Sequence, residues 1–349
     1  MNSRVLVVGA GSIGNFVGGK LAVAGADVTL VGRRRVLDDL SAAGLRLTDL
    51  DGGDETLPPE RFHVATEPDD VGSADLVLIT VKSAATAEAV RELSGKIRPG
   101  TVVLSLQNGV GNDSVIREIL PHCVVLAGMV MFNVVHHPGG HFHRATEGGL
   151  AVQDDPALAP FLDVFERTGL GVRRYPDLRP VQWAKLLLNL NNPINALSGR
   201  PLREELADRD YRRCLALTQR EALAVMTKAR IRPARLTPLP PRVMATLLTV
   251  PDRLFQRVAG QVLAIDPMAR SSMADDLALG RTTEISWLCG EIVGLGAMVG
   301  MPTPVNQRLI ELIVAAEQGD RRAWTGRDLL GQLRAAGAGS TPQHRANER

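Results

Sequence analysis

Three glycines near the start of the chain have the spacing G-x-G-x-x-G, at Gly9, Gly11 and Gly14. An apolar run, residues 4–8, precedes them and a helical run follows. In that context the first glycine permits a tight turn, the second lets the backbone approach a pyrophosphate, and the third allows close helix packing. The N–H groups around Ser12 and Ile13 would face the anion at the helix N-terminus. The alternative is a glycine-rich turn that binds no ligand.

Apolar runs farther along the chain indicate a parallel sheet. Short Val/Leu/Ile-rich runs without polar alternation occur at residues 4–8, 28–31, 76–81, 101–105, 124–131, 150–153 and 170–174. Such runs are typical of strands buried on both faces, and helical stretches between several of them favour crossover connections. The predicted fold class is therefore α/β, with an N-terminal doubly wound parallel sheet.

The texture of the sequence changes after "YPDLRP", residues 175–180, to long stretches of helical periodicity. We therefore expect a dinucleotide-binding domain over residues 1–176 and an all-helical domain over residues 177–334. Within the second domain the Pro-rich residues 232–242 predict a loop or a helix-breaking elbow. Residues 335–349 are predicted to be a disordered tail.

The charge is nearly balanced, with 40 Lys and Arg against 38 Asp and Glu. This balance argues against a nucleic-acid or membrane-surface partner and favours a small molecule. Cys123, Cys214 and Cys289 contain no C-x-x-C pair, which is typical of a reducing compartment. We find no signal peptide or spanning segment, so we expect a cytoplasmic protein, as a monomer or homodimer.

The strand expected at residues 28–31 is followed by Gly32 and Arg33, where a site for NAD would offer Asp or Glu to the ribose 2′-hydroxyl. Arg33 can pair with a 2′-phosphate through its planar guanidinium, and no carboxylate at that position opposes the phosphate. We therefore predict NADP(H) as the cofactor. Arg34 and Arg35 are interpreted as solvated charges at the start of a helix, although one of them could stack on adenine.

Polar residues interrupt an apolar helical stretch, "VQWAKLLLNLNNPINALSG", residues 181–199. Lys185, Asn189 and Asn192 stand at i, i+4 and i+7, which places them on one helix face. Pro193 cannot donate to the carbonyl of Asn189, so we expect the helix to be interrupted there. The alternative for Lys185 is an ordinary surface charge, but the leucines around it argue against that interpretation.

Two further polar motifs have plain structural alternatives. In "RSSMADDLALGRTTEI", residues 270–285, Ser271 and Ser272 could be N-caps, and Glu284 could be a first-turn carboxylate that complements the helix dipole. The four histidines of "HHPGGHFH", His136–His143, suggest zinc, but the Pro-Gly-Gly centre indicates a hairpin and the motif contains no Cys or acidic ligand. We predict no metal site.

Five separated motifs together resemble the ketopantoate reductase family, also called 2-dehydropantoate 2-reductase. They are GAGSIG at the start, VKS at 81–83, QNGVGN at 107–112, KLLLNLNNP at 185–193 and SSMADDLALGRTTEI at 271–285. The resemblance runs from about Arg4 to about Leu333. It implies NADPH-dependent reduction of ketopantoate to pantoate in pantothenate and coenzyme A biosynthesis, by an N-terminal Rossmann domain and a C-terminal helical domain.

The resemblance also implies roles for individual residues. Lys185 matches the family's catalytic lysine and Glu284 its active-site glutamate. The residues that match its substrate-binding positions are Asn108, Asn189, Asn192 and Ser272. Those that match cofactor contacts, besides the glycine turn, are Arg33, Lys82 and Asn108.

This chemistry is intelligible from the residues alone. Hydride delivered to a ketone carbon leaves a developing alkoxide, which an ammonium such as Lys185 can stabilise and protonate. A nearby carboxylate, here Glu284, helps to keep that lysine charged, and amides and a hydroxyl can bind a small 2-oxo acid.

Two departures from the family pattern leave the exact substrate open. The stretch between Asn189 and Pro193 is one residue shorter than is common, and the segment 239–267 is longer than expected. One alternative is therefore a related NADPH-dependent reductase of another small branched oxo acid. Another is a non-catalytic NADP(H)-sensing module, but such a module would not need Lys185 with Glu284 as a proton-donating pair.

Overall fold

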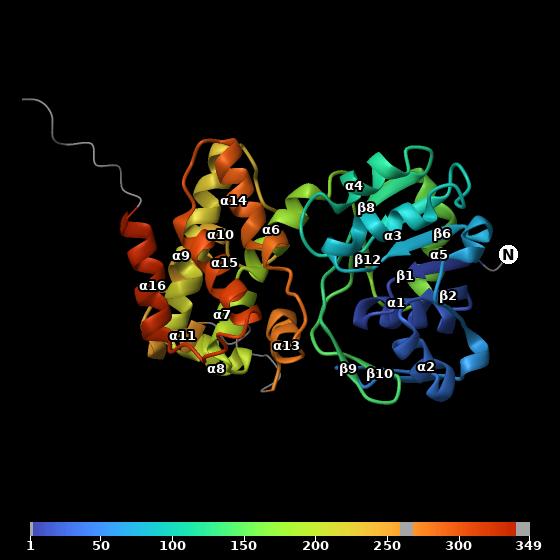
Figure 1. The fold of residues 1–349 in the computed structure, drawn as a ribbon, viewed down its shortest axis with the longest axis horizontal. Helices are drawn as coiled ribbons and strands as arrows, with labels where there is room; N and C mark the ends of the chain where they lie inside the picture. The colour runs from blue at the N-terminus through green and yellow to red at the C-terminus, as the bar shows by residue number, and fades with distance from the viewer. Residues whose placement is uncertain (1–2, 259–267, 340–349) are drawn as a thin grey trace, which may run out of the picture. The chain divides into compact units, whose positions relative to one another are not determined.

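The computed structural model describes residues 3–258 and 268–339 (Figure 1). The chain divides into two compact units, Met1–Gln182 and Trp183–Arg349. The division falls within helix α6 (Arg179–Asn189).

An eight-stranded sheet forms the centre of the first unit. In spatial order its strands are β12 (Val172–Tyr175), β11 (Leu150–Gln153), β8 (Val124–Val130), β7 (Val102–Ser105), β6 (Leu76–Ile79), β1 (Arg4–Val8), β2 (Asp27–Val31) and β5 (His63–Ala65). The α/β class is confirmed, as are the apolar runs that predicted every strand of this sheet except β5, but the sheet is mixed. Strand β11 runs antiparallel to β8, because a hairpin and not a crossover helix connects them.

Strand β1 lies at the point where the strand order reverses. It pairs in parallel with β2 on one side, Val5 beside Val28, and with β6 on the other, Val5 beside Leu76. In doubly wound sheets ligands bind outside the carboxyl ends of the strands at such a point. The glycine turn follows β1, Arg33 follows β2 and Lys82 follows β6, so the predicted cofactor residues come from that edge.

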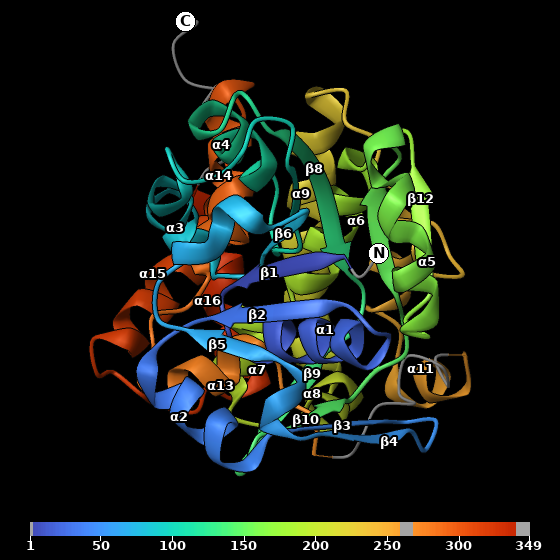
Figure 2. The same ribbon diagram turned by 90° about the vertical axis from the view of Figure 1, so that its right-hand side faces the viewer.

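Helix α1 (Ser12–Val23) lies between this sheet and a second one (Figure 2). The second sheet has the order β4 (Asp54–Leu57), β3 (Leu45–Asp49), β10 (His141–Arg144) and β9 (Val134–His137). A Cβ at Gly18 would lie 2.8 Å from Leu30 of the large sheet, and one at Gly19 would lie 2.9 Å from Leu47 of the small sheet. These two glycines allow both sheets to approach one helix.

The predicted hairpin at His136–His143 is confirmed as β9 and β10, but the rest of the small sheet was not predicted. Strand β10 pairs in parallel with β3, His141 beside Arg46, which joins segments far apart in the sequence. The Thr48 hydroxyl lies 2.8 Å from both His141 Nε2 and His143 Nδ1. Among residues 3–258 and 268–339 no group of three or more His, Cys, Asp or Glu side chains could hold a metal.

Helices cover both faces of the large sheet. Helix α5 (Ala159–Arg167) contributes Phe161 and Phe165 to the same core as α1. On the opposite face α3 (Thr86–Leu93) and α4 (Asn112–Ile119) bury Val90 and Ile116 against Val77 and its neighbours. Helix α2 (Arg34–Ala43) follows β2 and buries Leu37.

The described part of the second unit is helical, as predicted. After α6 its helices are α7 (Asn192–Ser198), α8 (Leu202–Ala207), α9 (Arg209–Lys228), α10 (Pro241–Leu247), α11 (Asp252–Val258), α13 (Ser272–Ala278), α14 (Cys289–Met298), α15 (Pro304–Glu317) and α16 (Gly326–Gly339). No helix of the described residues has the length and hydrophobicity needed to cross a membrane.

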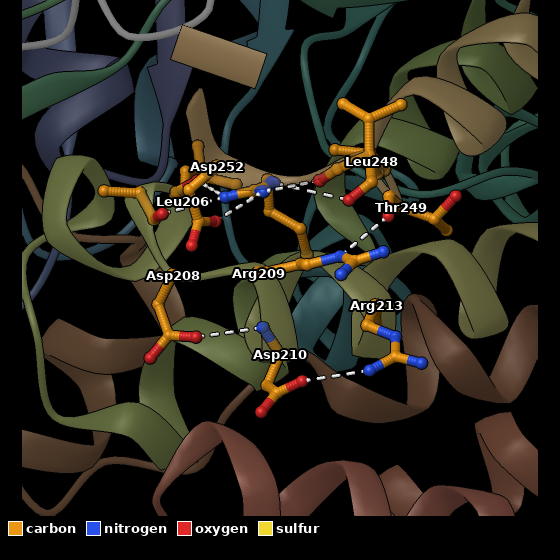
Figure 3. A network of polar contacts seen from close by, with 11 residues as sticks. Leu206, Asp208, Arg209, Asp210, Arg213, Leu248, Thr249 and Asp252 are labelled. Carbon is orange, nitrogen blue, oxygen red and sulfur yellow. Dashed lines mark hydrogen bonds and ion pairs between the residues drawn. The ribbon is translucent and has the colours of Figure 1, made fainter. Parts of the chain in front are cut away.

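A fully buried arginine on α9 organises one end of this unit. Arg212 donates hydrogen bonds to Leu206 O, Ala207 O, Leu248 O, Val250 O and Asp252 Oδ1, at 2.8–3.3 Å. Figure 3 shows Leu206, Leu248 and Asp252 close to one another. Beside them, Arg209 donates a hydrogen bond to the carbonyl of Thr249. Part of the unexpectedly long segment 239–267 is thereby tied to α8 and α9; residues 259–267 lie outside the described part.

Two further sequence predictions concern a loop and the C-terminal end of the second unit. Residues 232–240 are a loop, as predicted for the Pro-rich segment. The tail predicted from residue 335 was wrong for residues 335–339, which form the end of α16, where Leu329, Leu330 and Leu333 are buried. Residues 340–349 lie outside the described part.

Candidate functional site

The glycine turn is required by the fold at two positions and leaves space at the third. Gly9 has φ +115°, and a Cβ at Gly14 would lie 2.1 Å from the carbonyl oxygen of Gly9. A Cβ at Gly11 would meet nothing within 4 Å. Helix α1 starts directly after Gly11 without a side-chain cap or a first-turn acid. The turn therefore leaves backbone N–H groups and open space beside Gly11, which suits a bound anion.

The end of β2 excludes the acidic residue that an NAD site would use. A Cβ at Gly32 would lie only 2.5 Å from the Cβ of Ala10, so any side chain there would force the loop to move. The next three residues, Arg33, Arg34 and Arg35, are exposed, and none of their side chains forms a hydrogen bond or ion pair with another described residue. Helix α2 has no acid in its first turn. Its N-terminus therefore concentrates positive charge that an anion would offset.

Two motifs distant in sequence, VKS and QNGVGN, are joined by buried amides. Gln107 Nε2 donates to Val81 O at 2.9 Å and to Thr86 Oγ1 at 2.6 Å. The Thr86 hydroxyl in turn donates to Asn112 Oδ1 at 3.2 Å. Gln107, Asn112 and Thr86 are not among the predicted site residues, although buried amides inside a motif at a strand end need such partners.

This network fixes the backbone at two predicted contact residues. Asn112 Nδ2 donates to the carbonyl of Asn108 at 2.8 Å, and Ser83 Oγ donates to the same carbonyl at 3.1 Å. Lys82, immediately before Ser83, is exposed, and Asn108 is partly exposed. The structure therefore brings the backbones of 82–83 and 108 together and leaves both predicted side chains accessible.

The polar stripe of the second unit begins on α6. That helix ends at Asn189 and α7 begins at Asn192, with Pro193 in its first turn, so the predicted interruption is confirmed. Lys185 is partly exposed, yet burial lowers the pKa of its ammonium to about 8. Among the described residues, no other residue accepts or donates a hydrogen bond with the side chains of Lys185, Asn189 or Asn192.

The start of α13 is held against the start of α7. Ser271, and not Ser272, caps α13, since its Oγ accepts from Ala274 N at 3.2 Å. The Ser271 hydroxyl also donates to the carbonyl of Asn192 at 3.2 Å. Ser272, the first residue of α13, is exposed.

The structure does not pair the two predicted catalytic residues. Glu284 precedes the short 3-10 turn η5 (Ile285–Trp287) and is partly exposed. Within the described part of the chain no ion pair joins it to Lys185, and burial is the cause of the lysine's pKa shift.

A buried carboxyl with two asparagines was missed by the sequence analysis. Asn191 Nδ2 donates to Glu205 Oε2 at 2.9 Å and Asn195 Nδ2 donates to the same oxygen at 3.4 Å. Asn195 Oδ1 accepts from Ser271 N at 2.9 Å. The sequence feature that could have indicated it is the run of asparagines in "NLNNPIN", residues 189–195, of which only Asn189 and Asn192 were predicted as site residues.

Comparison with known proteins identifies the family. The ketopantoate reductase PanE/ApbA family matches residues 5–156, and its C-terminal family, ketopantoate reductase PanE/ApbA C terminal, matches residues 177–317. A 2-dehydropantoate 2-reductase of Halobacterium salinarum is 33% identical over 327 residues, covering 90% of this chain and 99% of the relative. The chain belongs to the ketopantoate reductase family. It is accordingly an oxidoreductase.

Other ketopantoate reductases agree with this assignment. The 2-dehydropantoate 2-reductase of Mycobacterium tuberculosis is 29% identical over 323 residues, covering 91% of this chain and 99% of that protein. A crystal structure of a PanE/ApbA family ketopantoate reductase from Ralstonia eutropha matches with a TM-score of 0.78 at 29% identity, covering 91% of this chain and all of the other. A D-mandelate dehydrogenase at 20% identity, with a TM-score of 0.73, shares the fold.

Proposed function

We propose that this protein reduces 2-dehydropantoate (ketopantoate) to pantoate with NADPH, on the route to pantothenate and coenzyme A. The observation that carries the proposal is the stripe of Lys185, Asn189 and Asn192. The side-chain ammonium and two side-chain amides of this stripe make no hydrogen bonds with the described residues, so these polar groups are available to a ligand. Relatives named 2-dehydropantoate 2-reductase support this substrate.

The choice of NADPH over NADH rests on the end of β2. The open space at Gly11 fits a dinucleotide pyrophosphate, and Gly32 excludes the carboxylate that would repel a 2′-phosphate. Arg33, exposed and without an ion pair among the described residues, is the proposed phosphate partner, with Lys82 and Asn108 as further cofactor contacts. NADPH, when bound, supplies the hydride.

Lys185 is the proposed proton donor. A developing alkoxide is stabilised by an ammonium that donates a hydrogen bond to it, and protonation then completes the alcohol. A pKa of about 8 leaves the lysine mostly protonated at pH 7 and makes it a stronger acid than an ordinary lysine. Asn189, Asn192, Asn108 and Ser272 are proposed to bind the carboxylate and hydroxyl of the oxo acid, and Glu284 to favour the charged lysine.

The test is NADPH oxidation measured over a panel of 2-oxo acids that includes ketopantoate. We expect ketopantoate to have the highest kcat/KM in the panel. A higher kcat/KM for another small branched oxo acid would retain the reaction and replace the substrate. NADPH binding without oxidation by any acid would overturn the proposal and favour a cofactor-sensing module.

A further inference from the structure

The second unit contains a buried carboxyl that the proposed reaction does not use. Glu205 on α8 has no exposed surface. Its Oε2 accepts hydrogen bonds from Asn191 and Asn195, whereas its Oε1 has no hydrogen-bond partner among residues 3–258 and 268–339. The Oδ1 atom of Asn191 is also buried and likewise has no hydrogen-bond partner in the described part of the chain. Two buried acceptors without donors substantially lower the stability of the folded protein, unless a hydrogen lies between them.

One proton on Glu205 would satisfy both oxygens. A carboxylic acid and a primary amide are complementary, because the amide N–H donates to one acid oxygen while the acid O–H donates to the amide oxygen. The first of these bonds is present, from Asn191 Nδ2 to Glu205 Oε2 at 2.9 Å. The unpartnered Oε1 and Oδ1 are the remaining atoms of the same two groups.

Burial first, and the charge of Asp208 second, favour the neutral form of Glu205 by raising its pKa. The titratable and charged groups that face it are Asp208, Tyr211 and Cys214, with Arg200 over the Tyr211 ring and Arg212 on the next helix. Asp208 raises the pKa of Glu205, and Arg212 donates instead to carbonyls and Asp252. Burial raises the pKa of Glu205 to about 8, and the two asparagine hydrogen bonds only partly oppose it.

The same carboxyl is connected to two residues of the proposed substrate site. Asn195, which donates to Glu205, accepts the N–H of Ser271, and Ser271 donates to the carbonyl of Asn192. Asn192 is the first residue of α7 and Ser272 the first residue of α13. Glu205 therefore connects the starts of the two helices that present these side chains.

We propose that Glu205 is kept as the neutral acid, forms two hydrogen bonds with the side-chain amide of Asn191, and positions Asn192 and Ser272. The positioning role rests on the function proposed above. Glu205 is a positioning residue, since it acts through Asn191, Asn195 and Ser271. Glutamine is the isostere of the neutral acid, so Glu205→Gln should keep both hydrogen bonds to the Asn191 amide, with its NH₂ donating to Asn191 Oδ1.

The first experiment compares Glu205→Gln with Glu204→Gln, the same change at an exposed glutamate on the same helix. The native state keeps a proton on Glu205 that the unfolded chain releases above its ordinary pKa of 4.5, so this group's contribution to stability falls as pH rises from about 4.5 to about 8. Over that window the unfolding equilibrium constant should rise up to about tenfold per pH unit more in wild type and Glu204→Gln than in Glu205→Gln.

Denaturant unfolding at a series of pH values measures this difference. Identical pH slopes in Glu205→Gln and Glu204→Gln would overturn the neutral-acid pair. Infrared spectroscopy of the folded protein gives a second measurement: a protonated-carboxyl band at pH 6–7 in wild type that disappears in Glu205→Gln supports the pair. A folded wild type without that band contradicts it.

The positioning role is tested by measuring kcat and the KM for the oxo acid separately in Glu205→Ala and Glu205→Gln. Glu205→Ala should raise the KM for the oxo acid about tenfold or more while NADPH affinity stays unchanged, and Glu205→Gln should restore the wild-type KM. A KM for Glu205→Gln as high as that of Glu205→Ala would overturn the role. If no oxo acid is reduced, the positioning role fails with the proposed function, whereas the unfolding and infrared measurements still decide the acid–amide pair.

Discussion

The two units constrain their proposed site residues by different physical means. In the first unit the limits are steric: a side chain at Gly14 or Gly32 would collide with backbone or with Ala10, and open space remains beside Gly11. In the second unit the limits are electrostatic, since burial lowers the pKa of Lys185 and raises that of Glu205, both to about 8. The glycine turn of the first unit can therefore be tested by substitutions that add a side chain. The buried titratable residues of the second unit must be tested by changing their charge or the pH.

The largest effect is expected at Lys185. Lys185→Ala should lower kcat by about two to four orders of magnitude, the range for loss of a general acid, and Glu284→Ala should lower it less. NADPH titration by fluorescence should be unchanged, because every residue proposed to hold the cofactor lies within Met1–Gln182. Lys228→Ala, at the exposed end of α9, is the matched control. A near-normal kcat for Lys185→Ala would exclude this proton donor.

The next effect tests the arginine that follows β2. Arg33→Ala should weaken NADPH binding about ten- to a hundred-fold, the equivalent of about 1.5–3 kcal/mol for a charge-assisted contact, and leave NADH binding unchanged. The measurement is KM for each cofactor, with the exposed Arg61 changed to alanine as control. Equal use of both cofactors by the unmodified protein would contradict the argument.

The pH profile separates the two units without a mutation. If the Lys185 ammonium is the acid, kcat/KM should fall by about tenfold per pH unit above about 8, because the lysine then loses the proton it must donate. Cofactor titrations over the same range should show no such break. A kcat/KM that stays constant to pH 10 would show that Lys185 keeps an ordinary pKa or that another group gives the proton.

The smallest effects come from two glycines of one motif. Gly14→Ala should lower the free energy of unfolding by about 1–3 kcal/mol, because its Cβ would meet the carbonyl of Gly9. Gly11→Ala should change stability by no more than about 0.5 kcal/mol, yet weaken cofactor binding about tenfold. Denaturant unfolding and cofactor titration of both variants measure this. Equal destabilisation by both would mean that Gly11 serves the fold and not the ligand.

Short-range patterns predicted much of the fold. Buried apolar runs predicted the strands of the large sheet other than β5, and Pro193 predicted the break between α6 and α7. The direction of β11 and the pairing of β3 with β10 were not predictable in this way, because backbone pairing between distant segments leaves no local period.

The candidate site shows the same division between local sequence patterns and contacts between distant segments. Residue types and their spacing led us to propose Gly9, Gly11, Gly14, Arg33 and the Lys185–Asn189–Asn192 stripe, since a turn, a charge and a helical repeat are local properties. Only the tertiary structure decided that Gly32 has no room for a side chain, that Gln107 and Asn112 join two motifs, and that Glu205 is buried against Asn191. Desolvation and steric exclusion depend on what surrounds an atom in space, and the neighbours that surround these atoms come from distant parts of the chain.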